Sequence, residues 1–112
     1  MLEPLTDLGK RKVVQYVDYS GSGGDEADGH GTHVSGSVAG YSEGTGNTYK
    51  GMASGSKIAF FDIGPRGVDS SLKIPPDLRN MFPTAYSAGA RLHSNSWGGG
   101  YFYDSYCIEV DE

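Results

Sequence analysis

One apolar run constrains the fold of this chain more than any other stretch of its sequence. Residues 57–64 read KIAFFDIG, which is nearly continuous in apolar side chains and ends on a glycine. A strand of this kind has no polar face to present to water, so it suits a position where both faces are covered. The sequence therefore predicts a sheet with packing elements above and below this strand.

The segments before this run show a strand pattern followed by a helix pattern. Residues 12–20, KVVQYVDYS, are rich in valine and tyrosine and stop at a glycine-rich loop, which is typical of a strand. Between residues 29 and 41, Val34, Val38 and Tyr41 recur with helical spacing. We therefore expect a helix there, with Asp28 as its N-cap.

The segments after the run repeat the same order. An apolar stripe between residues 78 and 86 predicts a second helix, which Pro83 either kinks or places at its start. Residues 90–100, ARLHSNSWGGG, are then expected to form a last strand that ends in glycine. Alternation of strands and helices predicts an α/β fold with three parallel strands and helices packed on the faces of the sheet.

The chain of 112 residues fits one domain, and we expect residues 1–112 to be a fragment of a larger one. Three strands and two helices make a small core, with sheet edges that a larger fold would cover. An isolated chain of this kind is therefore expected to be marginally stable or prone to aggregation.

Charge and cysteine content exclude several classes of function. The net charge of −5 disfavours nonspecific binding to nucleic acid or to an anionic membrane. No apolar run is long enough to span a bilayer, and the first residues do not resemble a signal peptide, so any such signal would lie outside this sequence. The single cysteine, Cys107, can form no internal disulfide and no zinc-binding cysteine motif.

Two histidines, His30 and His33, stand at the start of the first predicted helix. Unpaired N–H groups give that end partial positive charge, which disfavours a charged imidazole and keeps His30 available as a base. Small residues follow, Gly36 and Gly40 among them, and we expect them to let the helix approach its neighbours closely. From spacing alone, a structural or surface role for either histidine remains open.

The residues themselves resemble a known family. The sequence HGTHVSG at residues 30–36 resembles the His-Gly-Thr-His-Val-Ala-Gly signature of the subtilases, the subtilisin-like serine proteases, with Ser35 in place of alanine. Residues 49–64 are similar to the family's Gly-Val-Ala-Pro-Gly-Ala-Lys turn and the strand after it, with Met52 and Ser54 as departures. The sequence SNSWGG near residue 96 is similar to the family's substrate-binding strand.

This resemblance implies a partial subtilisin-like fold and a serine endopeptidase that works through an acyl-enzyme. His30 would be the general base, and Ser96, Trp97 and Gly98 would form the edge strand that binds a peptide or protein substrate. His33 would be a structural neighbour on the helix. The family also implies a location outside the cytosol, either secreted or in an endomembrane lumen. We expect no cofactor in this chain, with calcium left open for the parent protein, because many subtilases bind it.

The other two members of the catalytic triad have no match in the sequence. Only eleven residues separate Asp18 from His30, and Asp18 stands in a segment that better matches the strand after the family's aspartate. Asp7 lacks the Asp-[Ser/Thr]-Gly motif, and no serine stands in a Gly-Thr-Ser-Met setting. We therefore expect the isolated chain to be catalytically inactive.

Two other readings stay open. His30 and His33, with Asp28 or His93, could bind zinc, whereas Glu43 and Asn47 offer only a thin oxygen site for calcium. The chain could instead be a non-catalytic peptide-binding remnant of a subtilase. The flanking coding sequence separates this remnant from a protease, since only a protease would carry the missing aspartate and serine motifs there.

Overall fold

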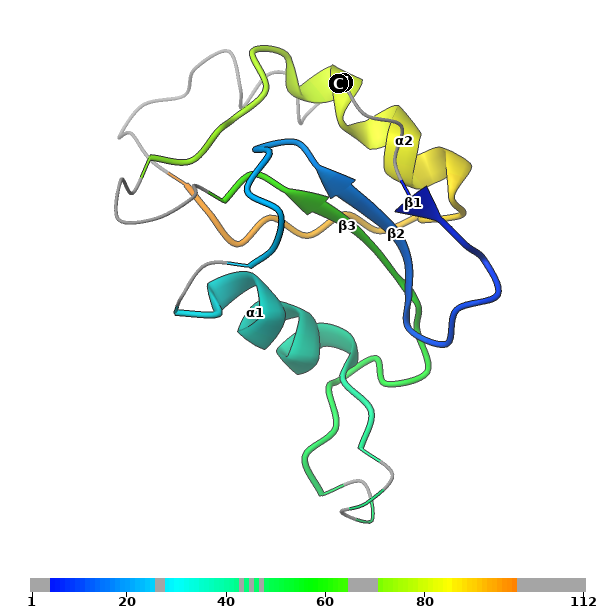
Figure 1. Cartoon of the computed structure of the whole chain (residues 1–112). Coiled ribbons are helices and arrows are strands. Elements are labelled where there is room, and N and C mark those ends of the chain that lie inside the picture. The colour runs from blue at the N-terminus through cyan, green and yellow to red at the C-terminus, as the bar shows by residue number, and fades with distance from the viewer. Residues whose placement is uncertain are drawn as a thin grey trace.

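The computed structural model describes residues 5–25, 28–42, 44, 46, 48–64 and 71–98. Figure 1 shows its helices and strands along the chain. A 3₁₀ turn, Leu78–Asn80, directly precedes the second helix. The elements, in chain order, are β1 (Leu5–Thr6), β2 (Val13–Asp18), α1 (His30–Ala39), β3 (Ile58–Asp62) and α2 (Phe82–Ser87).

The three strands form one sheet in the order β1-β2-β3. Strands β2 and β3 are parallel and pair from Val13 opposite Ile58 to Asp18 opposite Asp62. Helix α1 lies between them in the sequence, as the alternating pattern predicted. The α/β fold class is confirmed, and so are the positions of both strands and of α1.

The third strand differs from the prediction. It is β1, which is antiparallel to β2, and not residues 90–98, the described part of the strand predicted at 90–100. Residues 91–98 are assigned to no helix or strand, and Leu92 keeps 95% of its surface exposed. The expectation of three parallel strands was therefore wrong in this structure. A strand depends on a neighbour that pairs with its backbone, and within the described ranges no strand ladder reaches this segment.

The two helices cover opposite faces of the parallel pair (Figure 1). The ring of Phe60 lies against the start of α1, close to Gly31. Phe61, the next residue of β3, lines a small cavity on the other face together with Val17 and Met81, the residue that precedes α2. Strand β3 is thus covered on both sides, which confirms the prediction from its apolar run.

The core lies between this sheet and the helices. The largest fully buried side chain is that of Leu78, and the other buried apolar residues are Val14, Val17, Ala39, Ile63 and Met81.

Pro83 stands in the first turn of α2, so the proline marks the start of that helix and does not kink it. Within the described part of the chain, no helix combines the length and the apolar character needed to cross a membrane.

Candidate functional site

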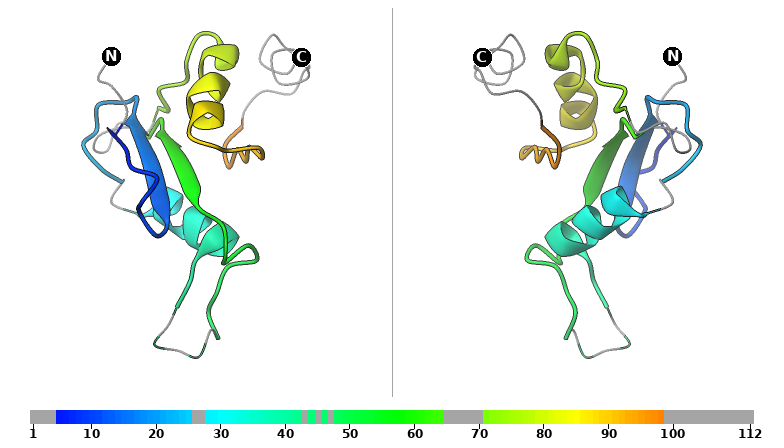
Figure 2. Two further views of the ribbon diagram at one scale, coloured as in Figure 1. Left: turned by 90° about the vertical axis from the view of Figure 1, so that its right-hand side faces the viewer. Right: turned by 90° about the vertical axis from the view of Figure 1, so that its left-hand side faces the viewer.

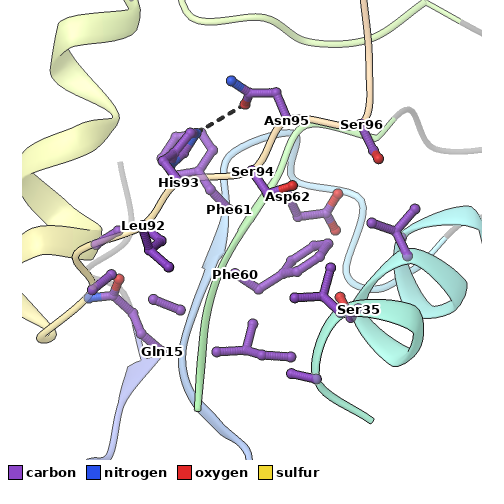
Figure 3. Close-up of a pocket in the computed structure, with 18 of the residues that line it drawn as sticks. Gln15, Ser35, Phe60, Phe61, Asp62, Leu92, His93, Ser94, Asn95 and Ser96 are labelled. Carbon is purple, nitrogen blue, oxygen red and sulfur yellow. Dashed lines mark hydrogen bonds between the residues drawn. The ribbon is translucent and has the colours of Figure 1, made fainter. Parts of the chain in front are cut away.

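A cavity of about 1090 Å³ lies between β3, helix α1 and residues 90–98. Figure 2 shows residues 91–98 beyond β3, on the side away from β2. Figure 3 shows Phe60 and Asp62 on one wall and Ser94, Asn95 and Ser96 on the segment opposite. The residues predicted for the site, His30, Ser96, Trp97 and Gly98, all line this cavity.

His30 is the first residue of α1, and its side chain is exposed. The N-cap residue is Gly29, whose φ of 69° lies in the left-handed region that glycine adopts without steric cost. The expected N-cap, Asp28, therefore stands one position too early, because the chain turns at the glycine. Its carboxylate still accepts a hydrogen bond from the His30 backbone N–H, at 3.1 Å.

A second carboxylate also serves the start of α1. Asp25 Oδ2 accepts a hydrogen bond from the Thr32 backbone N–H at 3.0 Å. The positive end of the helix is thus met by two negative groups, which satisfy two of its backbone N–H groups. Sequence reasoning missed Asp25, and the acidic loop before the helix was its only signal.

Close approach of α1 to its neighbours occurs at both ends of the helix. A Cβ on Gly31 would lie 3.0 Å from Cζ of Phe60, and one on Gly51 would lie 2.6 Å from both the carbonyl oxygen of Gly36 and the nitrogen of Gly40. At Gly36 itself a Cβ would meet no described atom within 4 Å. Close approach of the helix is therefore confirmed and involves Gly40, but it does not require a glycine at position 36.

Asp62, at the end of β3, is the most buried carboxylate in the described ranges, at 7% exposure. It accepts hydrogen bonds from the hydroxyl of Tyr16, from the Gly64 N–H at 2.9 Å and from Ser22 Oγ at 3.4 Å. Burial, together with the hydrogen bond and charge of Asp62, raises the pKa of the Tyr16 hydroxyl, which therefore stays a proton donor at neutral pH. Sequence reasoning missed this group, although an aspartate that ends an apolar run was a usable signal.

Asp18 is occupied by the turn that follows β2. Its carboxylate accepts hydrogen bonds from the backbone N–H groups of Ser22, at 3.0 Å, and Gly23, at 2.9 Å. In the described part of the chain, no hydrogen bond joins the imidazole of His30 to Asp18 or to Asp62. The geometry gives Asp18 a local role in shaping the turn.

Residues 94–98 form the wall of the cavity opposite β3. Ser96 and Gly98 are exposed and Trp97 is half-buried. A Cβ on Gly98 would meet no described atom within 4 Å, so its backbone is open to approach. Gly99 and Gly100, which extend the glycine run, lie outside the described residues.

The ligands suggested for zinc do not come together. His93 packs edge-on against the ring of Phe82 at 4.8 Å, and its Nε2 lies 3.0 Å from Asn95 Oδ1. Across residues 5–25, 28–42, 44, 46, 48–64 and 71–98, no three histidine, cysteine or acidic side chains gather into a possible metal site. Glu43 and Asn47, considered for calcium, and Cys107 lie outside these ranges.

Comparison with known proteins shows which family this sequence matches. The model of the subtilase family matches residues 7–112. The protein tagD of Dictyostelium discoideum, named a serine protease/ABC transporter B family protein, is 40% identical over 95 residues, which cover 82% of this chain and 5% of tagD. Two further proteins of the same organism carry the same family name. The protein tagB is 41% identical over 112 residues, and tagA is 31% identical over 105 residues.

The chain spans only 5–6% of the length of these three relatives. The tagB alignment covers 89% of this chain, and the tagA alignment covers 90%. No solved structure matches the chain significantly. The family match extends over nearly the whole sequence, and we conclude that the chain belongs to the subtilase family.

Proposed function

We propose that this chain is the part of a serine endopeptidase catalytic domain that carries the general base, His30. The observation that supports this most directly is the position of His30. It begins a helix that is held at both ends, and its exposed side chain lines a cavity whose opposite wall is residues 94–98. An exposed imidazole facing a groove is accessible to both a nucleophile and a substrate.

In the proposed reaction, His30 takes the proton of a serine hydroxyl as the serine oxygen attacks the carbonyl carbon of a peptide bond. The imidazolium then gives that proton to the leaving amine as the C–N bond breaks, which leaves an acyl-enzyme. Water, deprotonated by the same imidazole, hydrolyses the ester and restores the serine. The substrate peptide would lie along Ser96, Trp97 and Gly98 as an added strand.

The serine and the aspartate of this mechanism would come from sequence that flanks these 112 residues. Two observations support this proposal. The chain covers only 5% of the length of tagD. The carboxylate of Asp18 accepts hydrogen bonds from the turn that follows β2, so it is already bound there. The isolated chain is accordingly proposed to be inactive, because its base has no activated serine from which to take a proton.

A fluorophosphonate probe, which labels activated serines, tests this function. We expect no labelling of the 112-residue chain, and labelling of the longer polypeptide encoded by this chain with its flanking sequence. His30→Ala should reduce that labelling by about 10³-fold or more. The matched control is His33→Ala, because His33 is exposed on the same helix but does not line the cavity.

Two results would contradict the proposal. Labelling of the isolated chain would mean that it contains its own nucleophile. Equal labelling of the His30→Ala and His33→Ala polypeptides would remove His30 from the mechanism. If the flanking sequence contains neither triad motif and the chain still binds peptides, the non-catalytic remnant is the correct description.

A further inference from the structure

We propose that Phe60 is a positioning residue for His30, and that Tyr16 and Asp62 hold Phe60 in place. This inference rests on the proposed function, because it explains how the base is kept at the cavity. The three side chains come from β2 and β3, whereas His30 lies on α1, so they would transmit the position of the sheet to the start of the helix.

The first step is the contact between Phe60 and Gly31, the residue directly after His30. Cζ of the Phe60 ring lies 3.0 Å from the place where a Cβ on Gly31 would stand, and Cε2 lies 3.8 Å from it. The ring tip therefore occupies the space that a side chain would take. The first turn of α1 rests on this ring, and only a glycine at position 31 permits so short a distance.

The second step is the stacking of Tyr16 on Phe60. Their ring centroids are 5.7 Å apart and their planes differ by only 10°. The two residues also stand opposite each other in the parallel ladder of β2 and β3. A ring that is stacked on a neighbour in this way has little freedom to tilt, so the tip of Phe60 is held against Gly31.

The third step is the anchoring of Tyr16 by Asp62. The Tyr16 hydroxyl donates a hydrogen bond to Asp62 Oδ2, and the other carboxylate oxygen accepts the Gly64 N–H at 2.9 Å. A buried carboxylate with several donors is costly to move, because any lost partner leaves negative charge unpaired. This fixes the end of the Tyr16 ring, and through it the ring of Phe60.

A second pair of stacked rings lies near α2. Tyr19 stacks on Phe61 with ring centroids 5.3 Å apart, and both line the small cavity near Pro75 and Met81. Phe61 also lines the main cavity, whereas Tyr19 does not. Tyr19→Leu, which removes a stacked ring away from the main cavity, is therefore the matched control for Phe60→Leu.

The test uses the longer polypeptide and a fluorophosphonate probe, with the saturating labelling rate (kinact) and the half-saturating concentration (KI) measured separately. We expect Phe60→Leu to lower kinact about tenfold or more and to change KI less than twofold, since the base is displaced but the groove remains. Tyr19→Leu should leave kinact within about twofold of the parent value.

Three further variants separate positioning from loss of core packing. Gly31→Ala places a methyl group against Phe60 Cζ and should lower kinact, and the double variant Gly31→Ala/Phe60→Leu should recover much of that loss, because leucine vacates the space. Phe60→Tyr keeps the ring and adds a hydroxyl to Cζ, the atom nearest Gly31. It tests the same contact if Phe60→Leu fails to fold.

A measurement that does not depend on catalytic activity distinguishes failure of this inference from failure of the proposed function. The ¹H–¹⁵N signals of the His30 imidazole, identified by their loss in His30→Gln, should shift in Phe60→Leu and Phe60→Tyr but not in Tyr19→Leu. Independent effects of Gly31→Ala and Phe60→Leu, or equal imidazole shifts in the two leucine variants, would overturn the inference. If the parent protein is not labelled at all, the proposed function fails and these imidazole shifts alone decide the positioning role.

Discussion

The two ends of α1 are held in different ways. At the C-terminal end, three backbone N–H groups of a following loop donate to carbonyl groups of the last turn and the C-cap. These bonds run from Gly51 to Gly40 at 2.8 Å, from Met52 to Ser37 at 3.2 Å and from Ala53 to Val38 at 2.7 Å. At the N-terminal end, the carboxylates of Asp25 and Asp28 accept hydrogen bonds from backbone N–H groups. One end is thus closed by main chain packed on main chain, and the other by exposed side chains.

This difference separates anchoring from adjustment. Backbone in contact with backbone leaves no room for a side chain, so the C-terminal end tolerates little change. Side-chain acceptors can move or be replaced at lower cost, and they lie at the end that carries His30. The helix is therefore anchored at the end opposite His30, and its start depends on weaker contacts and on the ring of Phe60.

Gly51→Ala should have the largest effect on stability. Its Cβ would lie 2.6 Å from both the Gly36 carbonyl oxygen and the Gly40 nitrogen, so the loop must move away from the helix. We expect a loss of about 3 kcal/mol in the free energy of unfolding, measured by urea unfolding of the longer polypeptide that includes the flanking sequence. Gly55→Ala is the control, because a Cβ there meets no described atom within 4 Å. Equal effects of the two substitutions would refute the anchoring role of Gly51.

Gly36→Ala should have a smaller effect of the opposite sign. The position is helical and exposed, and its Cβ would enter open space among the described residues. Alanine should therefore stabilise the helix by about 1 kcal/mol, seen as a higher urea midpoint with an unchanged slope. A destabilised variant would instead indicate that Gly36 faces a part of the protein outside the described residues.

Asp28→Ala should have the smallest effect of the three. It removes the acceptor for the His30 backbone N–H from an exposed position, for which we expect a loss of about 0.5 kcal/mol by the same urea measurement. Asp28→Asn keeps an acceptor oxygen and should retain most of the stability. If the alanine variant were as damaging as Gly51→Ala, the contrast between the two helix ends would not hold.

The sequence predicted the elements whose patterns are local. Helix α1 and strands β2 and β3 follow from the spacing and type of their own apolar residues. Strand β1, only two residues long, has no such pattern. Residues 91–98 have a strand-like sequence, but a strand also needs a partner, and pairing is a property of the neighbouring backbone.

The sequence predicted about as much of the candidate site as it did of the fold. The motif at His30 located one wall of the cavity and Trp97 the other, because both stand in recognisable stretches of sequence. The roles of Asp25 and Asp62 depend on a loop conformation and on the register that sets Tyr16 beside Phe60. The contact at Gly51 depends likewise on how a distant loop returns to the helix. Such relations between separate elements leave no periodic trace in one sequence.

The return of Gly51–Ala53 to the end of α1 also bears on the order of events during folding. The loop that makes these bonds is short in sequence, so its closure costs little chain entropy. Contacts of this kind form early, whereas a longer loop must close before residues 91–98 can lie opposite β3. We therefore expect the helix that carries His30 to form before the opposite wall of the cavity is in place.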